Sequence, residues 1–225
     1  MRRWLIALVV LAVVVGAVWV VRERLLISIG RLVVEETLPK PADLAVILAN
    51  PPVPAAEEAA RLVQNGYVRR VLILSWRTDT DDILDQLGIA VPKPHEVAVL
   101  VLRRMGVRSE AIRILPVEAS GTNGFVRVAA QYAHQCGFRS LMVITNRSHT
   151  GRTAKLMRGY LGNPSAVIMR ALSRDPYHPE RWWRDRESAR ELVAESLRWL
   201  NSFVVGDFWH EGDGRLSHFP DASCG

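Results

Sequence analysis

The chain has 225 residues, which is enough for one domain of ordinary size with an anchor and a short tail, and too few for two full domains. Hydrophobic residues make up 49% and charged residues 23% of it, as in globular proteins, but the first twenty positions hold a large share of the apolar ones. The formal net charge of +6 suits an anionic small molecule or a membrane surface, whereas the lack of Lys/Arg blocks interleaved with aromatics argues against nucleic acid as a partner.

An uncharged apolar run extends from Trp4 to Val21 and would measure about 27 Å as a helix, close to the thickness of a hydrocarbon core. Arginines flank it on both sides: Arg2, Arg3, Arg22 and Arg24. A cleaved signal peptide is the alternative, but its apolar region is normally shorter and ends in an A-x-A-like site, which does not follow here. We therefore predict an uncleaved signal anchor at residues 1–21.

The orientation of this anchor depends on which flank carries more positive charge, because basic residues favour the cytoplasmic side. Arg2, Arg3 and the terminal amine precede the run, and Arg22, Arg24 and Arg31 compete with them from the far side. We expect the N-terminus inside the cell and the soluble domain outside it, in the periplasm, held at the inner membrane by this single span.

The rest of the chain divides into a connector at 22–42, an α/β domain at 43–205 and a polar tail at 206–225. Short apolar runs alternate with amphipathic stretches, the pattern of a parallel α/β fold. The predicted strands are 44–49, 71–75, 112–116, 141–145 and 165–169, and the predicted helices are 54–65, 95–105, 122–135, 151–161 and 184–203. Right-handed crossovers between these strands predict a three-layer, mainly parallel open sheet of the Rossmann-like kind.

Glycines follow four of the predicted helices, where a left-handed residue commonly ends a helix: Gly66, Gly106, Gly137 and Gly162. In open parallel sheets, ligands bind at the carboxyl ends of the strands, near helix N-termini that favour anions. The loops after the strands are therefore where we look for a site.

The loop after the fourth predicted strand combines hydroxyls, an amide, an imidazole and two guanidiniums at a predicted helix start. Two guanidiniums suit phosphate or carboxylate oxygens, and an imidazole can transfer a proton near neutral pH. The alternative is a helix capped by Ser148 or Thr150 with solvated arginines. The candidates here are Thr145, Asn146, Arg147, Ser148, His149 and Arg152.

A second loop, after the third predicted strand, offers a carboxylate, hydroxyls and an amide: Glu118, Ser120, Thr122 and Asn123. Glu118 would orient His149 or a bound hydroxyl if the two loops meet. The alternative is an ordinary turn followed by a helix cap at Ser120 or Thr122. Ser75 ends the second predicted strand at the same edge of the sheet, and we include it as a ligand-binding candidate.

Other polar residues predict neither a metal site nor a cofactor. The aspartates between residues 79 and 85 lack the spacing of an EF-hand and are interpreted as a solvated acidic loop. Cys136 and Cys224 do not have metal-ligand spacing, and Cys136 is interpreted as a small buried hydrophobic residue. The glycine-rich dinucleotide and NTP motifs, the hydrolase elbow and the zincin motif are all absent from the sequence.

Several motifs in a fixed order, from about Asp43 to Phe203, resemble one known family. An Asp-initiated strand comes first, followed by an Ala-Ala-Arg-Leu helix that ends in Gly66. The strand VLILS and the segment Met105-Gly106-Val107 come next, with Ile112 after them. These match the order of the family's opening motifs.

The site loops carry the rest of the likeness. Residues 118–122 resemble an E-x-S-x-T loop, and residues 145–153 resemble a V-T-S-x-x-H-x-x-R-A signature that places His149 and Arg152 on its His and Arg. Trp182-Trp183, Arg186 and Glu195 look like a W-W helix near the C-terminus. With these motifs the chain resembles the bacterial family of YdcF, SanA and ElyC, long labelled a domain of unknown function.

The resemblance implies a role in the cell envelope, in peptidoglycan assembly, barrier integrity or handling of the lipid carrier undecaprenyl phosphate. It leads us to expect an anchored domain that binds a phosphorylated or otherwise anionic metabolite, with His149 and Arg152 at its centre. The chain departs from the family at 49–52, where members have glycines, and at 123–125, where a carboxylate is usual. The alternatives are a non-catalytic binding or scaffolding protein of the membrane, or a nucleotide- or S-adenosylmethionine-binding protein.

Overall fold

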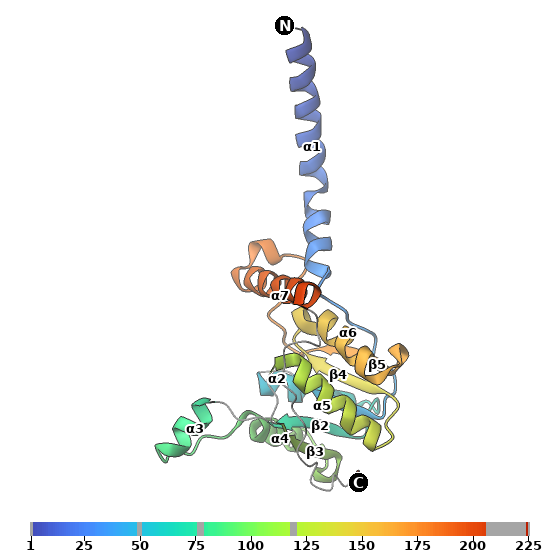
Figure 1. The fold of residues 1–225 in the computed structure, drawn as a ribbon, viewed down its shortest axis with the longest axis vertical. Coiled ribbons are helices and arrows are strands. Elements are labelled where there is room, and N and C mark those ends of the chain that lie inside the picture. The colour runs from blue at the N-terminus through green and yellow to red at the C-terminus, as the bar shows by residue number, and fades with distance from the viewer. Residues whose placement is uncertain (1, 49–50, 76–78, 118–120, 206–223, 225) are drawn as a thin grey trace.

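A computed structural model describes residues 2–48, 51–75, 79–117, 121–205 and 224 of the chain (Figure 1). Five strands form one all-parallel sheet in the order β3-β2-β1-β4-β5. They are β1 (Leu44–Ile47), β2 (Val71–Ser75), β3 (Ile112–Pro116), β4 (Leu141–Thr145) and β5 (Val167–Ala171). The predicted α/β fold with a parallel sheet is confirmed.

Helices cover both faces of this sheet, and each face has its own apolar core. Helices α2 (Pro52–Gln64) and α4 (Pro94–Arg104) pack on one face against alternate strand residues such as Ile47 and Ile73. Helices α5 (Gly121–Gln135) and α6 (Thr150–Leu161) cover the other face, over Val46 and Leu72. Because successive strand residues point to opposite faces, each continuous apolar strand supplies both cores.

Most element limits agree with the sequence. The second, third and fourth predicted strands have the observed bounds, and the five predicted helices begin and end within two residues of those observed. The four glycines that follow helices have positive φ angles of 73°, 87°, 68° and 69°, as predicted: Gly66, Gly106, Gly137 and Gly162. Helix α7 (Arg186–Val205), preceded by the 3-10 turn η4 (Trp182–Arg184), closes the described domain.

The acidic segment after β2 is not the predicted loop. It forms helix α3 (Asp79–Gln86). Asp85, near the end of this helix, forms an ion pair with Lys93 at 3.8 Å. Carboxylates near the start of a helix interact favourably with its positive end, so the aspartates that indicated a loop also suit a helix N-terminus. The prediction of an acidic loop was therefore wrong.

The N-terminal helix α1 (Arg2–Arg31) is longer than the predicted anchor and takes in the first ten residues of the predicted connector. Within it, Ile6–Arg31 is long and apolar enough to cross a membrane, with a mean hydropathy of 2.3. The helix passes residue 21 because Arg22-Glu23-Arg24 consists of good helix formers.

The last turns of α1 are fixed to the domain. The Tyr177 hydroxyl donates to the Gly30 carbonyl at 2.6 Å, and the Trp182 indole N–H donates to the Leu26 carbonyl at 2.7 Å. A Cβ at Gly30 would lie 2.5 Å from the Pro179 carbonyl oxygen, so only glycine allows this close approach. Figure 1 shows α1 leaving the domain as a straight helix beside α7.

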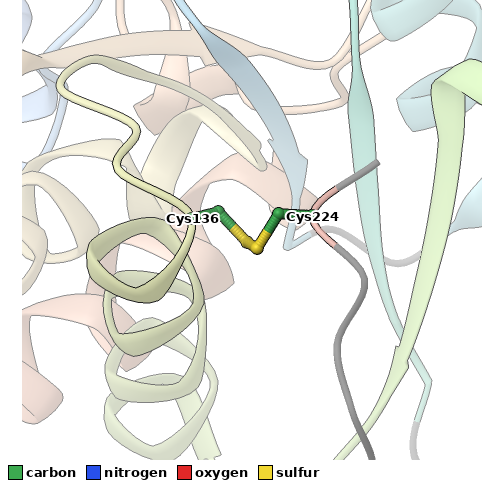
Figure 2. Close-up of a disulfide and its surroundings, with 2 residues drawn as sticks. All are labelled: Cys136 and Cys224. Carbon is green, nitrogen blue, oxygen red and sulfur yellow. A yellow bond between two sulfur atoms is a disulfide. The ribbon is translucent and has the colours of Figure 1, made fainter.

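Cys136 was interpreted as a small buried hydrophobic residue; it is partly buried against the core and also forms a disulfide with Cys224, with 5.4 Å between their Cα atoms (Figure 2). Cys136 directly follows the last residue of α5, at the end of that helix away from its N-terminus. The bond ties the C-terminal end of the chain to the α/β domain across a sequence separation of 88 residues.

Candidate functional site

A pocket of about 370 Å³ opens at the carboxyl end of the sheet. Its walls come from the ends of β1 and β4, from η2 (Arg147–His149), from the start of α5 and from α7. The lining residues are Leu48, Gly121, Thr122, Phe125, Thr145, Asn146, His149, Glu191 and Arg198. The chain adds β2 and β3 on one side of β1 and then continues with β4 and β5 on the other side. Open α/β sheets bind ligands in the crevice between two such strands, here β1 and β4.

His149 is the central titratable group of this pocket. Its Nε2 lies 3.7 Å from a carboxylate oxygen of Glu191 and 3.6 Å from one of Glu195, and 3.5 Å from a guanidinium nitrogen of Arg198. Burial lowers the pKa of His149 below its usual value of 6.5, and the two carboxylates only partly offset this. The imidazole is therefore neutral near pH 7 and able to accept a proton.

Glu195 is fully buried between two guanidiniums. It accepts a hydrogen bond from Arg152 Nε at 2.6 Å and another from Arg198 at 3.0 Å. Arg152 also donates to the Thr122 hydroxyl at 3.1 Å. These bonds join the starts of α5 and α6 to the middle of α7, so Arg152 stands behind the pocket wall and positions Thr122 and Glu195.

Arg147 is directed away from the pocket. Its Nε donates to Glu36 at 3.1 Å, one guanidinium N–H donates to the Tyr177 carbonyl at 3.3 Å, and its backbone N–H donates to Asp175 at 2.6 Å. These partners lie on the connector after α1 and in the loop after β5. Arg147 therefore ties the connector to the domain, and it is not among the pocket-lining residues.

The remaining candidates are divided between the pocket and other places. Ser148 is buried, with its hydroxyl 3.5 Å from Glu191. Asn123 accepts a hydrogen bond from the Tyr160 hydroxyl at 2.8 Å and does not line the pocket. Ser75 is bonded to His95 at 3.0 Å, and His95 lines a separate small hollow beside α4. Glu118 and Ser120 lie outside the described residues.

Sequence reasoning did not select Glu191 or Arg198, and it noted Glu195 only through the family resemblance. These three residues have the spacing i, i+4, i+7 and therefore share one face of α7. A charged stripe of this kind usually marks the solvent face of a helix, but here it faces the pocket. The signal that could have found them is the pairing of this stripe with an apolar stripe on the opposite face of the same helix.

The pocket thus offers one neutral imidazole, one guanidinium that is half-exposed, one carboxylate from Glu191, two threonine hydroxyls and an amide. Within the described ranges, no group of three or more His, Cys, Asp or Glu side chains is arranged to hold a metal ion. An arrangement of this kind can bind an anion by hydrogen bonds and can accept its proton.

Comparison of the chain with protein-family models, with curated proteins and with solved structures found no match. The family resemblance therefore stays a prediction.

Proposed function

We propose that the chain is a single-pass membrane protein of the cell envelope whose α/β domain binds a phosphorylated or otherwise anionic metabolite in the pocket around His149. The observation that carries this proposal is the position of the pocket, at the crevice between β1 and β4 and at the helix starts that follow the strands. Backbone N–H groups at such helix starts favour anions.

With His149 neutral, two guanidiniums (Arg152 and Arg198) balance two carboxylates (Glu191 and Glu195), so a bound anion would bring its own balancing proton, for which His149 is the acceptor. Glu195 is neutralised by Arg152 and Arg198, both within 3.0 Å. The Arg198 side chain is still 48% exposed, so one side of its guanidinium faces the solvent. A phosphate group placed there would also lie near His149 and would favour the protonated imidazole.

The proposed compartment is the extracytoplasmic side of the membrane. The disulfide between Cys136 and Cys224 supports it, because disulfides persist in oxidising compartments and are rare in the cytosol. The family resemblance points the same way, toward peptidoglycan or lipid-carrier metabolism. A lipid-linked phosphate is the anion that such a location would supply.

Binding of a short polyprenyl phosphate should depend on the pocket side chains. In full-length protein in nanodiscs, Arg198→Ala and His149→Ala should each weaken binding of farnesyl phosphate by about 10- to 100-fold, since each removes a hydrogen bond to a charged group. Titration calorimetry measures this. Arg103→Ala, on the exposed side of α4 far from the pocket, should bind as the wild type does.

Equal binding by all three variants would exclude the pocket as the ligand site. Inorganic phosphate in the same titration shows how much affinity comes from the phosphate group and how much from the prenyl chain. ATP and S-adenosylmethionine, tested as competitors, separate this proposal from the nucleotide-binding alternative. Release of phosphate from the probe separates hydrolysis from binding.

A further inference from the structure

Helix α7 carries an apolar stripe on its outward face. Val193, Leu197, Leu200 and Val204 are 57%, 60%, 58% and 76% exposed. Their spacing of four, three and four residues places all of them on one side of the helix. A row of four large exposed apolar side chains on one helix is unusual for a surface that faces only water.

This stripe points away from the α/β domain. Ser188, Leu192 and Glu195 are buried, and they lie on the side of α7 that packs against the rest of the domain. Figure 1 shows α7 lying across the base of α1, with the sheet and α6 on its other side. The outward face of α7 therefore points to the side on which α1 leaves the domain.

The position of α7 along α1 matches the membrane surface. The apolar run ends at Val21, and the guanidinium of Arg22 lies over the Trp19 ring at 3.3 Å. Just beyond Val21, η4 is attached to α1 through the ion pair between Arg184 and Glu23 at 2.7 Å and the hydrogen bond from Trp182 to the Leu26 carbonyl. Glu23 is two residues past Val21, and each residue of a helix adds about 1.5 Å. Because these contacts begin about 3 Å beyond Val21, η4 would lie at the depth of the lipid headgroups if the run from Trp4 to Val21 spans the hydrocarbon core, and α7 follows η4 directly in the chain.

Basic residues gather beside the N-terminal end of the stripe. Residues 22–31 and 180–190 together hold seven arginines against four acidic residues. Arg181, Arg184, Arg186 and Arg190 are all exposed. An apolar face bordered by arginines is the pattern of a helix that lies in the interface of an anionic membrane.

We infer that α7 is such an interfacial helix, with its apolar stripe resting at the boundary between headgroups and acyl chains of the membrane that α1 crosses. An anionic phospholipid surface is the partner that fits both the stripe and the arginines. A second copy of the chain fits less well, because a symmetric contact through this face would bring the arginines of both copies together. The inference does not depend on what the pocket binds.

Contact with the membrane would fix the pocket at the lipid surface. Glu191 and Arg198 line the pocket from the inner side of the same helix whose outer side carries the stripe. A phosphate attached to a membrane lipid would then reach the pocket without leaving the headgroup layer. The anchor alone would hold the domain near the bilayer, whereas α7 adds a defined depth.

Nitroxide labels at Leu197→Cys and Leu200→Cys, introduced one at a time, test this depth. The full-length chain with its disulfide intact is placed in nanodiscs that contain phosphatidylglycerol. Collisions of the label with oxygen, which concentrates in lipid, are compared with collisions with a water-soluble nickel chelate. We expect a severalfold higher oxygen-to-nickel ratio at both positions than at Ile83→Cys on α3, which is exposed and distant from α1.

A ratio equal to that at Ile83→Cys would overturn the inference. Shielding from both reagents would also overturn it, because it would indicate a protein partner, and dipolar coupling between labels would identify that partner as a second copy. A further variant, Leu197→Asp with Leu200→Asp, should lower the ratio at a label on Val193→Cys to the value on α3. Since all these positions are exposed, folding is expected to tolerate the substitutions, and thermal melting checks it.

Discussion

Replacing Glu195 with alanine is expected to lower the free energy of unfolding by about 3–5 kcal/mol, the range for breaking a buried ion pair. Glu195 is fully buried, and Arg152, which donates to it at 2.6 Å, has a side chain only 12% exposed. Without the carboxylate, the guanidinium of Arg152 stays buried with its charge unbalanced. Urea unfolding of the full-length protein in detergent, followed by tryptophan fluorescence, measures the change.

Glu187→Ala is the matched control on the same helix. Glu187 is 59% exposed and pairs with Arg190 at 3.7 Å, so its loss should change the free energy of unfolding by less than about 0.5 kcal/mol. Glu195→Gln keeps the volume and removes only the charge, and it separates a loss of charge pairing from a packing defect. If the Glu195→Ala and Glu187→Ala variants were equally stable, the charge cluster behind the pocket would not exist as described.

Loss of the disulfide is expected to have the second large effect. Cys136→Ser should lower the free energy of unfolding by about 2–5 kcal/mol, because the bond joins positions 88 residues apart and its removal frees a long loop in the unfolded chain. Urea unfolding measures this as well. Cys224→Ser and the double variant should show the same loss as Cys136→Ser, since all three remove one bond.

Thiol labelling checks both the bond and its compartment. In intact cells, a maleimide should label neither cysteine of the wild type before reduction and both after denaturation and reduction. A wild type labelled at both cysteines without reduction, together with a Cys136→Ser variant of unchanged stability, would contradict the disulfide. That result would also remove the main support for an extracytoplasmic domain.

The sheet was predictable because buried parallel strands are short continuous apolar runs. VLILS and LMVIT are such runs, and each is a buried strand with the predicted limits; IRILP, which contains Arg113, is the edge strand β3, also with the predicted limits. The fifth strand begins two residues later than predicted, because the Asn163 side chain accepts hydrogen bonds from the backbone and hydroxyl of Ser165. That local turn competes with the strand, and hydrophobicity alone does not show it.

From the sequence, only the pocket residues that follow the ends of strands could be predicted. Thr145, Asn146 and His149 lie where parallel strands end, and the topology brings them together with Thr122. Glu191 and Arg198 come from a helix that is more than forty residues further along, and the only local signal that its charged face turns inward is the apolar stripe on the opposite face. Arg147 was indistinguishable by composition from Arg152, because only tertiary contacts direct it to Glu36 instead.

The disulfide lay beyond sequence reasoning for the same reason. Two cysteines in a chain of this length predict no pairing by themselves, and Cys136 at the end of a helix resembles a small core residue. Only the fold brings Cys136 and Cys224 to a Cα separation of 5.4 Å.

The titration of His149 tests most directly the claim that this pocket binds an anion. Carbon-13 NMR of the full-length protein in nanodiscs, with all six histidines labelled and His149 assigned from the His149→Gln variant, follows each imidazole against pH. Without ligand, the pKa of His149 should lie below 6.5, because burial disfavours its charged form. The imidazole should therefore be neutral at pH 7.

Farnesyl phosphate should raise the pKa of His149, because a nearby negative charge favours the imidazolium. Binding should then take up a proton, and affinity should increase as the pH falls from 7.5 toward the pKa of the free protein. Because the phosphate group itself titrates near pH 6, the NMR signal of His149 is a cleaner measure than affinity alone. An upward shift confined to His149 is the predicted result, and an unchanged pKa at saturating farnesyl phosphate would contradict the proposed site.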